Sequence, residues 1–267
     1  MKSLFTLFLT AGLLLAAGCA SQPEPIPPPR ADLKLIWNDE FEGPALDPLK
    51  WERIPAPGEN PSAWRKYTSL RPDLVEVKDG DLILHVVLND DLKADPRPYL
   101  QGQVWTRNLF SYFYGLIEIR AKFEDQKGAW PAFWLLPDGL SWADGGEIDI
   151  MERLNSDPFV YQTCHCKWSL VLKKKVPRSG GKGDIDPGEY NVYGLEWTPD
   201  ELIWSVNGKE TFRYPRTGEA PEQWPFSQGP FYLLLDMQLE GSWVGPVEPS
   251  TLPVATYIDY VRVWQRK

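Results

Sequence analysis

The sequence predicts an all-β fold, a jelly-roll β-sandwich of two curved antiparallel sheets. Several segments alternate apolar and polar residues with the period of two that a strand with one buried face requires. Tight-turn dipeptides separate pairs of these segments, and 26 prolines and 21 glycines fit many short strands joined by turns and loops. After the N-terminal apolar run, no segment has the period of a long amphipathic helix. Many short strands with frequent turn signals are typical of sandwiches.

The N-terminal segment is expected to lie outside the fold. Lys2, an uncharged apolar run over 4–15 and small residues up to Gly18 have the order of an export signal, and the run is too short to span a bilayer. The Ala-Ala-Gly-Cys stretch that ends at Cys19 resembles the bacterial lipoprotein processing box. We therefore expect residues 1–18 to be removed and Cys19 to be acylated, with an ordinary signal peptide as the alternative.

Residues 19–30 then form the lipidated cysteine and a proline-rich tether, because they contain five prolines and almost nothing to bury. No second proline-rich break divides residues 31–267, so we expect a single domain there.

Within that domain, two dipeptides predict hairpins. Asp79-Gly80 lies between strands expected at 74–77 and 82–86, and Asn207-Gly208 between strands at 202–206 and 210–214. Further strands are expected at 116–123 and 258–264 from their alternation. Longer loops rich in Pro, Gly or charge are expected at 55–65, 90–100, 173–188 and 215–229.

Composition restricts the class of ligand. The net charge of -9 argues against nucleic acid and anionic lipid, which need a basic surface. A chain with 13 Trp and 11 Tyr suits a neutral, polyhydroxylated ligand whose C–H patches stack on aromatic faces, although most of these rings will be core. Cys164 and Cys166 flank His165 on a predicted strand, so they point away from it and are expected to be small buried thiols.

The segment Gly145-Gly-Glu-Ile-Asp-Ile-Met-Glu-Arg153 holds three carboxylates that neither regular geometry brings together. As a strand, Glu147 and Asp149 share one face and Glu152 the other; as a helix, the three diverge. One extra residue at Ile150–Met151, a β-bulge, would return Glu152 to the face of the other two. A solvated acidic strand is the alternative, but alternation with Ile and the preceding Gly-Gly pair disfavour it.

Such a trio suits the hydrolysis of a glycosidic bond. Retention of configuration needs an ionised carboxylate as nucleophile and a protonated carboxyl as acid, about 5–5.5 Å apart. Asp149 can hydrogen-bond and orient Glu147, and its charge helps to keep Glu152 protonated. Side chains converge in this way only on a concave surface, so the strand is expected to line a concave cleft.

These residues resemble the signature of glycoside hydrolase family 16, in which Glu-Ile-Asp is followed by a bulged Glu in a concave jelly-roll sheet. Five further motifs in the family's order carry the resemblance across most of the mature domain: Trp37–Phe41, Tyr114–Lys122, Gly128–Pro137, Tyr193–Trp197 and Tyr257–Val263. The resemblance implies a retaining endo-hydrolase with Glu147 as nucleophile, Asp149 as its assistant and Glu152 as acid/base.

The resemblance also implies substrate-binding residues. Trp130 and Trp134 match aromatic positions at the cleft, and His165 matches a histidine on the strand after the catalytic one. Trp134 and His165 also have a purely structural reading as packed residues. Trp243 is placed at the cleft because the polar stretch around it is unsuited to burying an indole, and Trp105 and Arg107 are weaker candidates.

No cofactor is expected for catalysis. Many members of the family hold a structural calcium on the convex face, and here Glu42, Gly80 and Asp259 match its ligands.

The sequence leaves two alternatives for the bond that is cut. The segment 233–245 looks more like members acting on mucin-type O-glycans and related β-galactosides, which favours β-1,4-galactosidic bonds, with endo-β-1,3(4)-glucanase activity as the alternative. A carbohydrate-binding lectin and a structural surface lipoprotein are the non-enzyme alternatives, and a transglycosylase would use the same acids. We expect a monomeric bacterial lipoprotein at the outer membrane or cell surface, with a glycan as its substrate and the membrane as a partner only through the lipid anchor.

Overall fold

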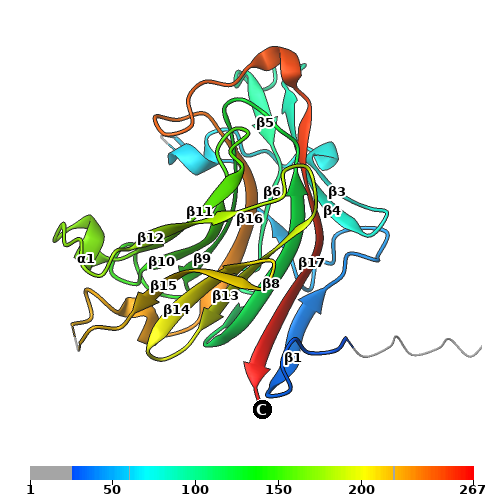
Figure 1. Ribbon diagram of the computed structural model, residues 1–267. Helices are drawn as coiled ribbons and strands as arrows, with labels where there is room; N and C mark the ends of the chain where they lie inside the picture. Colours follow the sequence, from blue (N-terminus) through cyan, green and yellow to red (C-terminus); the bar gives the residue numbers. More distant parts are fainter. Residues whose placement is uncertain (1–25, 60, 219) are drawn as a thin grey trace, which may run out of the picture.

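The fold is a sandwich of two antiparallel sheets, as the sequence predicts. A computed structural model describes residues 26–59, 61–218 and 220–267. The sheets lie face to face over a large apolar core, and in Figure 1 the C-terminus lies beside the start of β1. In the described part of the chain no helix is long and apolar enough to cross a membrane. The export signal and Cys19 lie outside the described residues.

The outer sheet has nine strands in the order β15-β14-β13-β8-β17-β4-β3, with β1 paired to β17 and β5 to β4. Its long central pair, β8 and β17, holds the alternating segments expected at 116–123 and 258–264. The strands of this sheet are β1 (Leu33–Asp39), β3 (Val75–Lys78), β4 (Asp81–Leu88), β5 (Tyr99–Gln101), β8 (Gly115–Phe123), β13 (Asn191–Trp197), β14 (Glu201–Val206), β15 (Lys209–Pro215) and β17 (Val254–Arg266).

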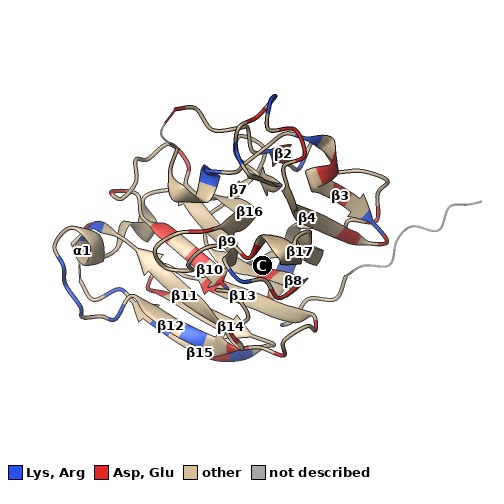
Figure 2. Cartoon of the chain, turned by 90° about the horizontal axis from the view of Figure 1, so that it is seen from above, with Lys and Arg blue, Asp and Glu red and all other residues tan. Residues whose placement is uncertain are grey.

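The inner sheet has eight strands in the order β12-β11-β10-β9-β16-β6-β2, with β7 paired to β16. Its strands are β2 (Glu52–Arg53), β6 (Gln103–Trp105), β7 (Ser111–Tyr112), β9 (Ala129–Pro137), β10 (Glu147–Glu152), β11 (Phe159–His165), β12 (Gly180–Asp184) and β16 (Phe231–Leu239). Figure 2 shows the acidic residues of β10 in the middle of this sheet, between β9 and β11.

Both predicted hairpins are present. Asp79-Gly80 joins β3 to β4 and Asn207-Gly208 joins β14 to β15. All four residues have positive φ, between 51° and 86°, which is the backbone of a type I′ turn and explains why Asn, Asp and Gly occupy these positions.

The prediction of a continuous loop over 173–188 is wrong, because it contains the edge strand β12, which pairs with β11. Its sequence, Gly180-Gly-Lys-Gly-Asp184, has no apolar alternation. The glycines are required by packing instead: a Cβ on Gly181 would lie 2.6 Å from the Cβ of Phe212, and one on Gly183 the same distance from Val206. The run Lys173–Lys175 stays in the exposed loop before this strand.

Helical structure in the described residues is limited to single turns. These are α1 (Lys167–Leu170) and the 3₁₀ turns η1 (Ala63–Arg65), η2 (Pro72–Leu74), η3 (Pro225–Ser227) and η4 (Pro249–Thr251). The turn η1 lies in the loop expected at 55–65 and is packed against β16, so this loop is held over the inner sheet.

Candidate active site

A β-bulge in β10 places all three predicted acids on the face of the inner sheet that points away from the core. Asp149 lies opposite Trp134 of β9, but Met151 already lies opposite Phe133, so one extra residue is inserted between them. Ile150 and Met151 are both fully buried in the core. Because two successive side chains point inward, Glu152 returns to the face of Glu147 and Asp149. The bulge is at the position predicted from the sequence.

The three acids line one pocket of about 400 Å³ on this face. Most of the other lining side chains are aromatic or small, a combination that offers flat apolar surfaces beside a few polar groups, as sugar sites require. The remaining lining residues are Ser62, Ala63, Trp64, Trp130, Ala132, Trp134, Leu136, Trp142 and Gln238.

Glu147 lies beside two donors. The indole Nε1 of Trp142 donates to its Oε2 at 2.5 Å, and Nε2 of His165 lies 3.9 Å from its Oε1. Burial, followed by the charge of Asp149, raises the pKa of Glu147 to about 8, while His165 and the Trp142 indole act to lower it. Of the groups around Glu147, these two favour its ionised, nucleophilic form.

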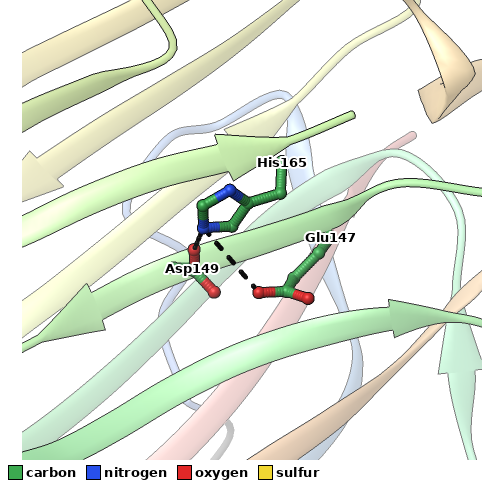
Figure 3. A group of neighbouring side chains, drawn as sticks. All are labelled: Glu147, Asp149 and His165. Atoms are coloured by element: carbon green, nitrogen blue, oxygen red, sulfur yellow. Dashed lines mark ion pairs between the residues drawn. The ribbon is translucent and has the colours of Figure 1, made fainter. Parts of the chain in front are cut away.

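Asp149 lies between the other two acids and is almost completely buried. Its Oδ2 is 3.3 Å from His165 Nε2, and Figure 3 shows the imidazole facing both Asp149 and Glu147. The carboxyl group of Asp149 acts directly on that of Glu147 and helps to raise its pKa. The backbone is also fixed here, since Trp204 Nε1 donates to the carbonyl of Asp149 at 2.8 Å. Burial raises the pKa of Asp149 to about 8.

Glu152 lies at the end of β10 and is 8% exposed. Trp130 Nε1 donates to its Oε1 at 2.9 Å. Burial, followed by the charge of Asp149, raises its pKa well above the ordinary value, and the charge of Glu147 raises it further. This raised pKa favours the protonated form of Glu152, which is the state a general acid requires.

The ligand atoms of Glu147, Asp149 and His165 lie within 4.8 Å of one another, a spacing that could hold a metal ion. The donor set argues against one, because the Trp142 N–H already points at Glu147 and competes with a cation for the same oxygen lone pairs. The arrangement fits a proton-transfer and nucleophile site better.

The other predicted cleft residues divide into two groups. Trp130, Trp134 and His165 lie at the pocket, and Trp134 donates its Nε1 to Asp236 at 2.9 Å. Trp243 extends the pocket: it is 45% exposed and packs edge-to-face on Trp130, with ring centroids 5.2 Å apart.

Trp105 and Arg107 do not line this pocket. Trp105 of β6 lies on the same face but is separated from β10 by the two strands β9 and β16; it lies opposite Leu234, and its indole donates to Glu52. The Arg107 guanidinium lies 5.3 Å from the centre of the Trp105 ring and 5.8 Å from that of Tyr232. The three side chains form a separate aromatic and cationic patch on the cleft face.

Several residues at the pocket were not predicted from the sequence, among them Trp64, Trp142 and Gln238, and neither was Asp236, which accepts from the pocket residue Trp134. Trp64 is on η1 and packs edge-to-face on Trp134, and Trp142 is in the loop before β10. Both belong to loops whose path over the cleft has no sequence signal. Asp236 and Gln238 did carry a sequence signal, because polar residues two apart within the apolar strand β16 indicate a strand with one functional face.

The predicted calcium ligands Glu42, Gly80 and Asp259 lie after β1, in the β3–β4 turn and on β17. The Asp259 carboxylate is paired with the Arg120 guanidinium, so it is already neutralised. This donor set does not fit a calcium site as it stands, and calcium binding stays a prediction.

Cys164 on β11 and Cys166, the residue after the end of this strand, are free, fully buried thiols, as predicted. Because they point inward, His165 between them points out towards the acids.

Comparison with known proteins gives one consistent family. Residues 92–261 match the family model described as "Glycosyl hydrolases family 16". The chain is 34% identical over 253 residues to a beta-glucanase from Rhodothermus marinus, covering 87% of this chain and 85% of that one. It is 32% identical over 240 residues to the keratan-sulfate endo-1,4-beta-galactosidase of Sphingobacterium multivorum, covering 88% of this chain but only 56% of the relative's length.

Two solved structures show the same architecture. One is SCLam, a non-specific endo-beta-1,3(4)-glucanase (TM-score 0.81, 30% identity, covering 91% of this chain and 95% of that one). The other is described under "Prominent members of the human gut microbiota express endo-acting O-glycanases to initiate mucin breakdown" (TM-score 0.74, 26% identity, covering 86% and 98%).

Proposed function

Because the chain belongs to glycosyl hydrolase family 16, we propose that it cuts internal β-glycosidic bonds of a glycan with retention of anomeric configuration. The observation that supports this most is the bulge in β10, which turns Glu152 into the pocket that already holds Glu147 and Asp149. A strand without the extra residue would leave one of the two required carboxyls in the core.

The proposed reaction has two displacements. Glu147 attacks the anomeric carbon while Glu152 donates its proton to the departing glycosidic oxygen, which gives a glycosyl ester on Glu147 and a free leaving-group sugar. Glu152, now ionised, then takes a proton from water as the water attacks the same carbon and releases Glu147. In this proposal Asp149 hydrogen-bonds to Glu147 and orients it, and His165, which lies beside both carboxyl groups, supports the negative charge on the pair.

The compactness of the cluster supports retention rather than inversion. Glu147 and Glu152 are on one strand and face, and the charge of Glu147 is close enough to raise the pKa of Glu152. An inverting pair must leave room for a water molecule between the sugar and the base. The indoles of Trp130 and Trp142 occupy the space beside these acids instead.

For the substrate, we propose β-1,4-galactosidic bonds of mucin-type O-glycans or related galactose-containing glycans. The similarity to a keratan-sulfate endo-1,4-beta-galactosidase and to the O-glycanase structure supports this choice. Endo-β-1,3(4)-glucanase activity is the second candidate, supported by the similarity to the beta-glucanase and to SCLam.

A lectin on the same fold has no use for three buried acids. Taking carboxyl groups out of water raises the pKa of each, which costs folding stability and gives no advantage in binding a neutral sugar. A transglycosylase would share the first displacement and differ only in the acceptor that enters.

We also propose that the chain is a bacterial lipoprotein held at the outer membrane or cell surface through Cys19. Arg30, at the end of the expected tether, is held against the domain, because its guanidinium donates twice to Glu196 at 2.7 Å. Replacement of Cys19 by alanine would move the protein from the membrane fraction to the soluble fraction; an unchanged distribution would contradict the anchor.

Product analysis tests the enzymatic proposal. The purified protein is incubated with mucin O-glycans, keratan, laminarin and lichenan, beside Glu147→Gln and the control Glu189→Gln, which replaces an exposed carboxylate on a turn. We expect oligosaccharides from one substrate, a β-anomer as the first product, and a loss of roughly a thousandfold or more in Glu147→Gln only. Binding without cleavage by any variant would favour the lectin, and an α-anomer as first product would contradict retention.

A further inference from the structure

The strand β16 carries two buried polar side chains beside the catalytic pocket, Asp236 and Gln238. Every residue of this strand is buried, and the others from Phe231 to Leu239 are apolar or aromatic. Asp236 is not exposed at all and Gln238 is 4% exposed. Burying a carboxyl and an amide in an otherwise apolar strand is unfavourable unless their polar atoms find partners, so these two side chains need an explanation.

Their register places them next to the acid/base. Asp236 lies opposite Ala132 of β9, and Ala132 lies opposite Glu152 of β10. Gln238 lies opposite Trp130, whose indole donates to Glu152. Only the small side chain of Ala132 stands between Asp236 and Glu152 in this register. Both Ala132 and Gln238 line the pocket.

Their hydrogen bonds are incomplete. Asp236 Oδ2 accepts from the Trp134 indole at 2.9 Å, and the amide of Gln238 lies close enough to act on the same carboxyl group and lower its pKa. Within the described part of the chain, Oδ1 of Asp236 and Oε1 of Gln238 have no partner. Gln238 lines the pocket, and its buried oxygen is an acceptor that the described protein leaves unmet.

We propose that Gln238 binds substrate, accepting a hydrogen bond from a ring hydroxyl of the sugar in the catalytic pocket, and that Asp236 positions it for this contact. The proposal rests on the hydrolase function above and adds a specificity-determining residue to it. A hydroxyl group is the donor that neutral sugars offer in quantity, and the surrounding indoles of Trp130 and Trp134 supply flat surfaces for the C–H faces of the same ring.

Unpaired acceptors give strong discrimination. A site built to receive a substrate hydroxyl rejects the analogue that lacks it, because the protein acceptor is then buried without a donor. Gln238 is therefore expected to separate sugars that differ in the position or orientation of one hydroxyl, which is the difference between galactose- and glucose-based glycans.

A double-mutant cycle between protein and substrate tests the proposal. The wild type and Gln238→Met, which keeps the length of the side chain but removes the amide, are assayed on the shortest oligosaccharide that the wild type cleaves and on its monodeoxy analogues. The control is Gln162→Met, which replaces another fully buried glutamine that does not line the pocket. Asp236→Asn is assayed in the same way.

We expect one monodeoxy analogue to lose roughly tenfold or more in kcat/KM with the wild type and with Gln162→Met, but less than about threefold with Gln238→Met. In Asp236→Asn the discrimination against that same analogue should shrink, since the amide oxygen is no longer held in place. A merely structural role would lower activity on all analogues alike.

Equal losses for every analogue in wild type and Gln238→Met would overturn the proposal, and would show that water alone meets these acceptors. If Gln238→Met does not fold, Gln238→Asn makes the same comparison, because it withdraws the amide oxygen by one methylene group. Absence of cleavage by the wild type on the parent oligosaccharide and on all polysaccharides would instead contradict the hydrolase proposal itself, so the two failures are distinguishable.

Discussion

At the residue scale, two indole N–H groups distinguish the proposed nucleophile from the acid/base. Trp142 donates to Glu147, and Trp130 donates to Glu152. A donor to a carboxylate stabilises the charged form and so lowers the pKa of that carboxyl group. Trp142 is 59% exposed on a loop, whereas Trp130 is half-buried beneath Trp243. The donor to the nucleophile is therefore the one that approaching substrate can displace or reorient.

Removal of either donor should shift a different limb of the pH profile. In Trp142→Phe the pKa of Glu147 rises, so the acidic limb of kcat/KM moves to higher pH, and activity on that limb falls roughly threefold to tenfold. In Trp130→Phe the pKa of Glu152 rises, so the basic limb moves to higher pH. The measurement is kcat/KM against pH on one substrate, with Trp168→Phe as a control outside the pocket. A shift of either limb to lower pH would contradict the assignment of roles.

At the element scale, the parts of the fold that were predictable have local causes. Asp79-Gly80 and Asn207-Gly208 set their hairpins because their own backbone angles form the turns. The bulge at Ile150–Met151 was predictable because only an extra residue reconciles buried isoleucines with three acids on one face.

The parts that were not predictable depend on contacts distant in the sequence. The strand β12 has glycines where strands usually have apolar residues, and Phe212 of β15 makes them necessary. Trp64 reaches the pocket because the side chains of Gln101 and Gln103 both donate to its carbonyl, which fixes the turn η1 over β16. Neither partnership is visible from the residues themselves, since each depends on which strands become neighbours.

The packing of β12 gives a matched pair of substitutions. Gly181→Ala places a Cβ 2.6 Å from Phe212, so the strand or the ring must move, and we expect a loss of about 1–3 kcal/mol in the free energy of unfolding. Gly180→Ala meets its nearest atom at 3.4 Å and should cost much less. Urea denaturation measures both. Equal effects of the two substitutions would show that β12 is not held by this contact.

At the scale of the whole molecule, the active site is a concentration of carboxyl groups within a chain of net charge -9. Burial raises the pKa of Glu147, Asp149 and Asp236 to about 8, and that of Glu152 well above its ordinary value. Each of these groups binds its proton more tightly in the folded chain than in the unfolded one. The carboxyls whose pKa is lowered, such as Glu40 and Glu196 in their arginine pairs, affect stability only in more acidic solution.

The stability of the protein should therefore fall as pH rises from about 5.5 to 8. Between the unfolded pKa of a carboxyl group near 4 and its folded value, the folded state holds more protons, and each extra proton lowers the free energy of unfolding by about 1.4 kcal/mol per pH unit. For a domain of this size, 1 kcal/mol corresponds to about 2–4 °C in Tm, so we expect Tm to fall by at least about 5 °C over this range.

Asp236→Asn, which removes one buried acid, should show a smaller fall and a higher Tm than the wild type at pH 8, whereas Glu189→Gln on the surface should follow the wild type. Calorimetry at constant ionic strength measures these values, and a Tm that is flat or rising towards pH 8 would mean that the acids ionise in the folded protein without strain, contrary to their burial.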